Sequence, residues 1–110
     1  MNKSILYISF LLISSFSPTS LAYTLYGTGS TESCGSWLQD EKDGWSSHVY
    51  NQNVGWLTGY VSAFSVATGQ RYKDTDVSAM LIYMNSYCQK HPLEPFATGA
   101  RMLVHELFID

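Results

Sequence analysis

The chain has 110 residues, of which 45% are hydrophobic, 15% aromatic and only 14% charged, and this composition excludes a disordered or low-complexity protein. Its length predicts one domain. The formal net charge is −3 at pH 7. This is the opposite sign to that of proteins that attract the phosphates of nucleic acids, so nucleic acid is not expected as a partner.

Residues 1–22 have the pattern of a secretory signal peptide. Lys3 precedes an apolar run over residues 5–16, and Ser20-Leu21-Ala22 precedes the expected cleavage point. An uncleaved membrane anchor is the alternative, but this run is shorter than the roughly 20 residues that a spanning helix needs. We therefore expect one α-helical domain over residues 23–110, no membrane span after cleavage, and a periplasmic or secreted location.

The only two cysteines are Cys34 and Cys88. Because exported proteins fold in an oxidising compartment, this pair is predicted to form a disulfide. In the chain-entropy model, closing this loop is worth about 4 kcal/mol, which is comparable with the whole stability of so small a domain. A zinc site made of both cysteines with His91 and either His48 or His105 is the alternative, and it is not favoured. We expect no metal and no other cofactor.

The first predicted helix follows Ser33, which is a good N-cap residue. It extends from Cys34 to about Asp43, with side chains three and four positions apart on one face. The preceding residues 23–30 are rich in glycine, serine and threonine and have no regular pattern, so we expect a flexible arm. The following polar residues 45–53 predict a loop or a ragged helix start.

The second predicted helix begins at Val54 and ends before Gly69, with apolar residues at helical spacing. Gly55, Gly59 and Ala63 form a row of small residues at intervals of four. A glycine inside a helix costs about 1 kcal/mol relative to alanine. We therefore expect another helix or a bound group to approach this row, and close helix packing inside the domain is the favoured interpretation.

Two further helices complete the predicted fold. The third begins at a cap formed by Asp74 or Thr75 and ends before Pro92. Its apolar face comprises Val77, Met80, Leu81, Met84 and Cys88. The last has Pro95 at an early position, and its apolar residues are Phe96, Ala100, Leu103 and Leu107. The sequence thus predicts an all-α, small single-domain bundle of about four helices with one disulfide.

Three segments carry a resemblance to known proteins: Cys34-Gly35-Ser36-Trp37, Gly55-Trp56-Leu57-Thr58-Gly59-Tyr60-Val61-Ser62-Ala63 and Tyr87-Cys88-Gln89-Lys90-His91-Pro92-Leu93. In this order, and with a closing amphipathic helix, they resemble the Rap/Tai immunity proteins of type VI secretion and, more loosely, the acid-stress chaperone HdeA. Both groups are small, α-helical and periplasmic, with one disulfide. The resemblance implies that Cys34 and Cys88 match that bridge, and that the row of Gly55 and Gly59 matches the central helix.

The resemblance implies a periplasmic binding or inhibitor protein, such as an immunity protein that neutralises a secreted toxin by occupying its active site. An HdeA-like chaperone or another envelope stress helper is the alternative, and it would need a homodimer that opens as carboxylates lose their charge in acid. The chain lacks the dense lysine and aspartate composition of that chaperone, which favours the first hypothesis. A protein partner, either a toxin or a client, is therefore expected.

An enzyme is not expected, because the sequence contains no motif that would place a nucleophile beside a base, an acid beside a base, or a set of metal ligands together. All three tryptophans lie between positions 37 and 56, close to the acidic stretch at positions 40–43. The candidate interaction face therefore comprises six residues: Trp37, Asp40, Glu41, Trp45, Trp56 and Tyr60.

Overall fold

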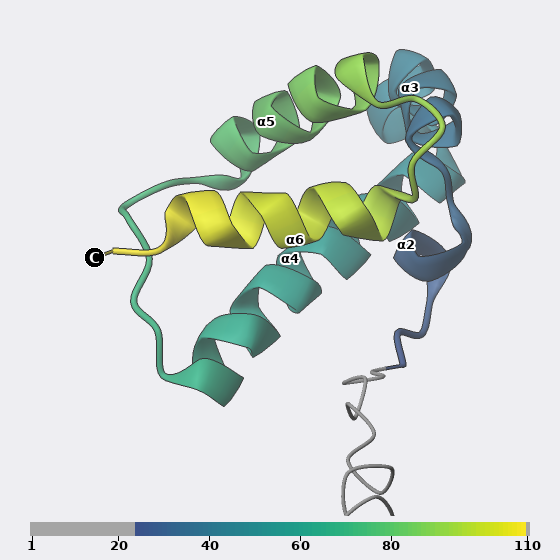
Figure 1. The fold of residues 1–110 in the computed structure, drawn as a ribbon. Coiled ribbons are helices and arrows are strands. Elements are labelled where there is room, and N and C mark those ends of the chain that lie inside the picture. The colour runs from purple at the N-terminus through teal and green to yellow at the C-terminus, as the bar shows by residue number, and fades with distance from the viewer. Residues whose placement is uncertain (1–23, 110) are drawn as a thin grey trace, which may run out of the picture.

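The computed structural model describes residues 24–109, and this part of the chain is an all-α domain with one disulfide, as predicted (Figure 1). The predicted signal peptide lies outside the described residues. The helices are α2 (Thr28–Thr31), α3 (Cys34–Asp43), the short 3-10 helix η1 (Gly44–Ser46), α4 (His48–Thr68), α5 (Val77–Lys90) and α6 (Phe96–Leu107). None of the helices within residues 24–109 is long and apolar enough to cross a membrane.

Helix α6 lies at the centre of the fold, between α4 and α5, and it also contacts α2 and α3 (Figure 1). All four apolar residues predicted for this helix are buried, and Val104 joins them. The other helices contribute further buried apolar side chains: Trp37, Tyr50, Val54, Leu57, Val61 and Met84. The core thus forms around α6, whose apolar stripe is wide enough to meet neighbours on several sides.

Side-chain caps fix where the helices begin. The Ser33 hydroxyl accepts a hydrogen bond from the Ser36 N–H at 3.1 Å, as the predicted cap of α3 should. Helix α4 begins at His48, six residues before the predicted start, because the Ser47 hydroxyl accepts from the Tyr50 N–H. Helix α5 begins later than predicted, because the cap is Asp76, rather than Asp74 or Thr75.

The disulfide between Cys34 and Cys88 joins the first turn of α3 to the last turn of α5. Backbone hydrogen bonds run between the same regions: the Cys34 N–H donates to the Glu94 carbonyl at 2.7 Å, and the Phe96 N–H donates to the Glu32 carbonyl at 2.9 Å. The predicted bridge is therefore confirmed, and it lies beside a hydrogen-bonded contact between residues 32–35 and 92–96.

The predicted packing of the small-residue row inside the domain is wrong. Gly55, Gly59 and Ala63 are exposed, and a Cβ added at either glycine would meet nothing within 4 Å among the described residues. The reason is the helical period, since about 3.6 residues per turn places this row on the side of α4 opposite its buried residues. Those buried residues are Tyr50, Asn53, Val54, Leu57 and Val61.

The predicted flexible arm is also wrong for the described residues from position 24 onward, because this segment packs against α4 and α6. The Trp56 Nε1–H donates a hydrogen bond to the Tyr26 carbonyl at 2.7 Å. Gly27 and Gly29 lie against the indole ring so closely that a Cβ at either position would collide with it. The sequence needs glycine here because the backbone approaches a large aromatic side chain.

Candidate functional site

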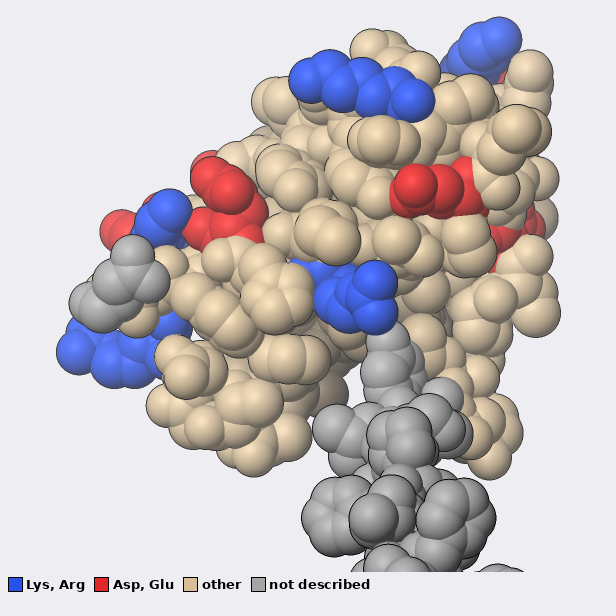
Figure 2. Space-filling model, viewed as in Figure 1, with Lys and Arg blue, Asp and Glu red and all other residues tan. Residues whose placement is uncertain are grey.

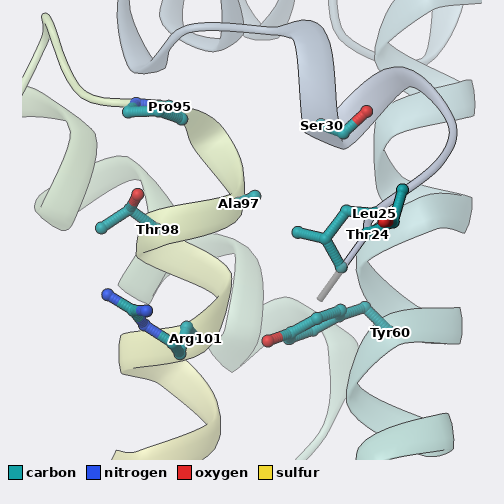
Figure 3. A pocket seen from close by; sticks show the side chains of 8 residues that line it. All are labelled: Thr24, Leu25, Ser30, Tyr60, Pro95, Ala97, Thr98 and Arg101. Carbon is teal, nitrogen blue, oxygen red and sulfur yellow. The ribbon is translucent and has the colours of Figure 1, made fainter. Parts of the chain in front are cut away.

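A groove lies between the N-terminal segment, α4 and α6 (Figure 3). It consists of two adjoining cavities, of about 420 Å³ and about 270 Å³, that share Leu25, Tyr60 and Arg101 in their lining. We call this feature the Arg101 groove. Its full lining comprises Thr24, Leu25, Ser30, Tyr60, Phe64, Pro95, Ala97, Thr98, Arg101 and His105. Its size is in the range of known ligand sites, which measure roughly 300–1,000 Å³.

The two cavities differ in chemistry. The larger cavity carries the hydroxyl groups of Thr24, Ser30 and Thr98, whereas the smaller one is built mainly from Leu25 and the rings of Tyr60 and Phe64. Arg101 and His105 are the lining residues that can carry a positive charge, and none of the described lining residues is a carboxylate. The groove therefore combines an apolar surface with groups that attract an anion, in a chain whose net charge is negative.

Helical spacing explains how α6 contributes to the groove. Thr98, Arg101 and His105 are three and four residues apart, so they share one face of the helix. In Figure 3, Arg101 extends along α6 with its guanidinium near Thr98, and Tyr60 reaches from α4 towards the same helix. Figure 2 shows that the described part of the face seen in Figure 1 is largely uncharged, with Lys, Arg, Asp and Glu side chains scattered over it.

Trp56 holds the N-terminal wall of the groove in place. Its indole donates to the Tyr26 carbonyl, next to the lining residue Leu25, and lies against Gly29, next to the lining residue Ser30. The ring also stacks on Tyr60, with ring centroids 5.2 Å apart and an angle of 15° between the rings. Trp56 thus supports two walls of the groove, the N-terminal segment and Tyr60 of α4. It is not itself one of the residues that line the groove.

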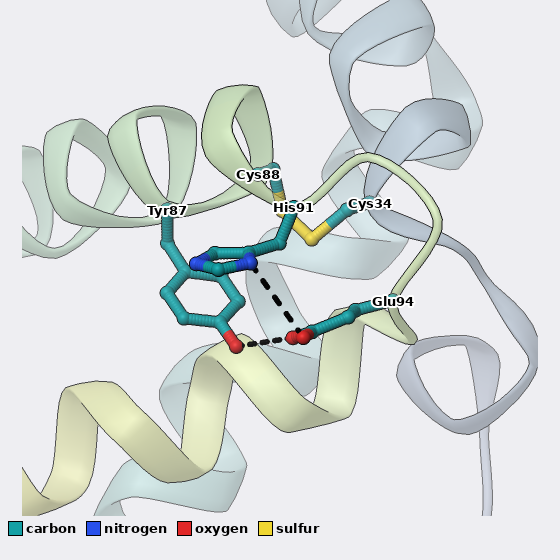
Figure 4. Close-up of polar contacts among 5 residues, drawn as sticks. All are labelled: Cys34, Tyr87, Cys88, His91 and Glu94. Carbon is teal, nitrogen blue, oxygen red and sulfur yellow. Dashed lines mark hydrogen bonds and ion pairs between the residues drawn. A yellow bond between two sulfur atoms is a disulfide. The ribbon is translucent and has the colours of Figure 1, made fainter.

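A second polar cluster lies beside the disulfide (Figure 4). The Tyr87 hydroxyl donates to Oε2 of Glu94, and Nδ1 of His91 lies 3.6 Å from Oε1 of the same carboxyl group. This hydrogen bond, together with burial, raises the pKa of Tyr87 to about 12, although the positive charge of Arg101 acts in the opposite direction. The phenol therefore stays protonated at neutral pH, and the cluster ties the connection between α5 and α6 to α5.

The structure separates the six residues of the predicted interaction face. The prediction of Trp37 as a surface residue is wrong, because its side chain is 0% exposed and packs against the rings of Tyr50 and Phe96. Its Nε1–H donates a hydrogen bond to Asn85 Oδ1. Asp40 and Glu41 are partly exposed on α3, away from the groove lining. The side chain of Trp45, in η1, lies outside the described structure. Tyr60 lines the groove and Trp56 supports it, so these two belong to the site.

Sequence reasoning missed most of the groove, including Arg101, His105, Thr98 and Leu25. The spacing of the three polar residues on the last helix is a signal that could have been used, but it indicates only a shared face. The zinc alternative is wrong, since its two cysteines are joined to each other. Within residues 24–109, no three His, Cys, Asp or Glu side chains gather where they could hold a metal ion.

No protein-family model matches the chain, and neither the curated proteins nor the solved structures include a match to it. The resemblance to immunity proteins and acid-stress chaperones therefore stays a prediction.

Proposed function

We propose that this protein is an exported binding protein, periplasmic or secreted, that docks a partner protein through the Arg101 groove. The observation that carries the proposal is the composition of the groove: aromatic and aliphatic side chains, hydroxyl groups and an arginine, contributed by three segments. Tyrosine and arginine are enriched among the residues that dominate protein interfaces. The proposal keeps an immunity-type inhibitor as the expected kind of protein. Of the predicted interaction face it keeps Trp56 and Tyr60 of α4, and it replaces the residues of α3 with the N-terminal segment and α6.

Exposed apolar side chains next to the groove favour a protein partner over a small molecule. Tyr26 is 81% exposed and follows the lining residue Leu25, and Leu93 is 96% exposed and lies two positions before the lining residue Pro95. Neither side chain lines the cavities, so a small molecule that filled them would leave both in water. A protein partner broad enough to reach these positions would add apolar burial to the contact.

The disulfide supports the exported part of the proposal. Stable disulfides form in oxidising compartments and are rare in the reducing cytosol. The bond between Cys34 and Cys88 closes a loop with a sequence separation of 54. A bond across so long a loop gives a small domain much of its stability in the chain-entropy model. The protein would therefore be expected to work where this bond persists.

Site-specific photo-crosslinking tests the proposal. A photoreactive side chain replaces Thr98 in the groove or, as the matched control, the exposed Ala63 on the outer face of α4. We expect one defined protein adduct from position 98, lost when Arg101→Glu is added, and no such adduct from position 63. An adduct from position 63 alone, or one from position 98 that survives Arg101→Glu, contradicts docking through the groove. Many different adducts formed only in acid would instead support the chaperone alternative.

A further inference from the structure

We infer that the Arg101 groove recognises the carboxyl end of a polypeptide whose last side chain is apolar. The inference rests on the proposed function, because it names the part of the partner that enters the groove. It follows from the way in which the two cavities meet at one arginine. Each component of a chain end, namely its carboxylate, its last side chain and its preceding backbone, has a matching part of the groove.

Arg101 is placed to bind the carboxylate. It lines both cavities, as Leu25 and Tyr60 do, so a ligand that occupies the two together comes within reach of its side chain. The planar guanidinium can bind both oxygens of a carboxylate through two parallel hydrogen bonds. It has five N–H donors, so a contact within the domain still leaves donors for a ligand. Its positive charge also acts on Tyr87 of α5. It lowers the pKa of that phenol, although the hydrogen bond to Glu94 and burial have larger effects in the opposite direction.

The smaller cavity suits the last side chain of the ligand. Leu25, Tyr60 and Phe64 supply its apolar lining, and Tyr60 and Phe64 are neighbours on α4 with ring centroids 6.2 Å apart. An aromatic or long aliphatic side chain placed here would exchange water contacts for contacts with both rings. A positively charged side chain would lose its hydration without finding a carboxylate among the described lining residues.

The larger cavity suits the backbone that precedes the last residue. The Ser30 hydroxyl donates to the Gly27 carbonyl at 2.8 Å, so its oxygen can still accept a hydrogen bond from a peptide N–H. The hydroxyl groups of Thr24 and Thr98 provide further acceptors and donors in the same cavity. An extended backbone could therefore satisfy its polar groups here, which a purely apolar surface would not allow.

A chain end fits this arrangement better than an internal acidic side chain. In a C-terminal residue the carboxylate and the side chain leave the same Cα atom, so both reach the junction of the two cavities from one point. In an internal aspartate or glutamate the carboxylate is the end of the side chain itself. No apolar side chain then leaves the same Cα atom to fill the smaller cavity, whose apolar lining is Leu25, Tyr60 and Phe64.

Fluorescence anisotropy with three labelled tetrapeptides tests the inference. The first ends in phenylalanine with a free carboxylate, the second is its C-terminal amide, and the third has an aspartate before the phenylalanine and an amidated end. The full chain is produced by export, so that its disulfide forms. We expect the free acid to bind about tenfold or more tighter than the amide, as for a hydrogen-bonded charge. The peptide with the internal aspartate should bind no better than the amide.

Substitutions locate the effect at Arg101. Arg101→Ala should remove the difference between acid and amide, and Arg101→Lys should keep only part of it, because lysine retains the charge without the planar fork. The matched control is Arg71→Ala, which removes an exposed arginine from the loop between α4 and α5. Trp56→Phe, which loses the hydrogen bond to the groove wall, should weaken the acid and the amide to the same degree.

Four results would overturn the inference. One is equal binding of acid and amide, the second is a preference for the acid that survives Arg101→Ala, and the third is tighter binding of the internal aspartate peptide. Displacement of the free acid by 3-phenylpropionate at the same concentration would also overturn it, because a small carboxylate would then be sufficient. Each of these results leaves the crosslinking at position 98 unaffected, so failure of the inference is distinguishable from failure of the proposed function.

Discussion

Alanine substitution at the two outward glycines of α4 should make the protein more stable. Gly55 and Gly59 lie inside a 21-residue helix, and a Cβ at either position meets nothing within 4 Å among the described residues. Each Gly→Ala change therefore adds no collision and removes the excess backbone freedom of glycine in the unfolded chain. The expected gain is the difference in helix propensity alone.

That difference is about 1 kcal/mol for each glycine in a helix interior. Because both added methyl groups point into solvent, the double variant should gain about 2 kcal/mol, the sum of the two. For a domain of this size, about 1 kcal/mol corresponds to a shift of roughly 4–8 °C in Tm. The double variant should therefore melt about 8–16 °C above the parent protein.

The matched control is Gly99→Ala in α6. A Cβ at position 99 would lie 2.8 Å from Cε of Met84 and 2.9 Å from Cδ1 of Tyr87. The methionine end can move, but the tyrosine ring is held by its hydrogen bond to Glu94. Such overpacking costs about 1–3 kcal/mol, so Gly99→Ala should lower stability despite the better helix propensity of alanine.

Urea unfolding followed by circular dichroism measures all these variants, and an unchanged m-value shows that the midpoint reports stability. The reasoning would be refuted if Gly55→Ala or Gly59→Ala lowered the midpoint, because a face in contact with solvent cannot lose contacts on gaining a methyl group. It would also be refuted if Gly99→Ala raised the midpoint as much as the outward variants do.

Two further predictions concern the disulfide and the partly buried phenol of Tyr87. Replacing Cys34 and Cys88 together by serine should lower the unfolding free energy by about 4 kcal/mol in the chain-entropy model, and equal urea midpoints for this variant and the oxidised parent would contradict that. The raised folded-state pKa of Tyr87, about 12 against 10.0, means that its contribution to stability is fully present below pH 10 and is lost as the pH rises through 12. Tyr87→Phe should therefore reduce the fall in Tm between pH 10 and pH 12, measured by melting the protein at a series of pH values. An unchanged fall in Tm over this range would contradict the stabilising role given to the protonated Tyr87 hydroxyl.

Helix α6 was predictable because its pattern is local. Its apolar residues are three and four positions apart, and all of those named from the sequence are buried in the centre of the fold. The predicted end of α4 is equally local, since Gly69 takes the left-handed conformation, with φ of 69°, that glycine adopts most easily. Signals of this kind depend only on residues within one or two turns.

The start of α4 and the start of α5 show where local signals become ambiguous. The polar composition of residues 48–53 suggests a loop, yet Tyr50 and Asn53 are buried and lie on the same face as Val54 and Leu57. The tertiary contacts of that face, together with the Ser47 cap, extend the helix through a polar stretch. At the start of α5, positions 74–76 all carry residues that can cap a helix, so the sequence could not select Asp76.

The groove could not be predicted from local patterns, because its walls come from three distant parts of the chain. Tyrosine and tryptophan occur both in cores and at interfaces, since each has an apolar body and a hydrogen-bonding group. Trp37 is buried because its Nε1–H finds Asn85 in the adjacent helix, 48 positions away in the sequence. Trp56 instead binds the carbonyl of Tyr26 and supports the groove. Only the long-range partner of each indole distinguishes these two roles.

The disulfide and the groove are connected through the same short segments. The N-terminal wall ends at α2, and the next residue, Glu32, accepts a hydrogen bond from the Phe96 N–H at the start of α6. The nearby hydrogen bond from the Cys34 N–H to the Glu94 carbonyl joins a cysteine of the disulfide to the residue that precedes the lining residue Pro95. A bond that holds residues 32–35 against residues 92–96 therefore also fixes the distance between two walls of the groove. An oxidising compartment would thus supply both the stability of the domain and the geometry on which its proposed binding depends.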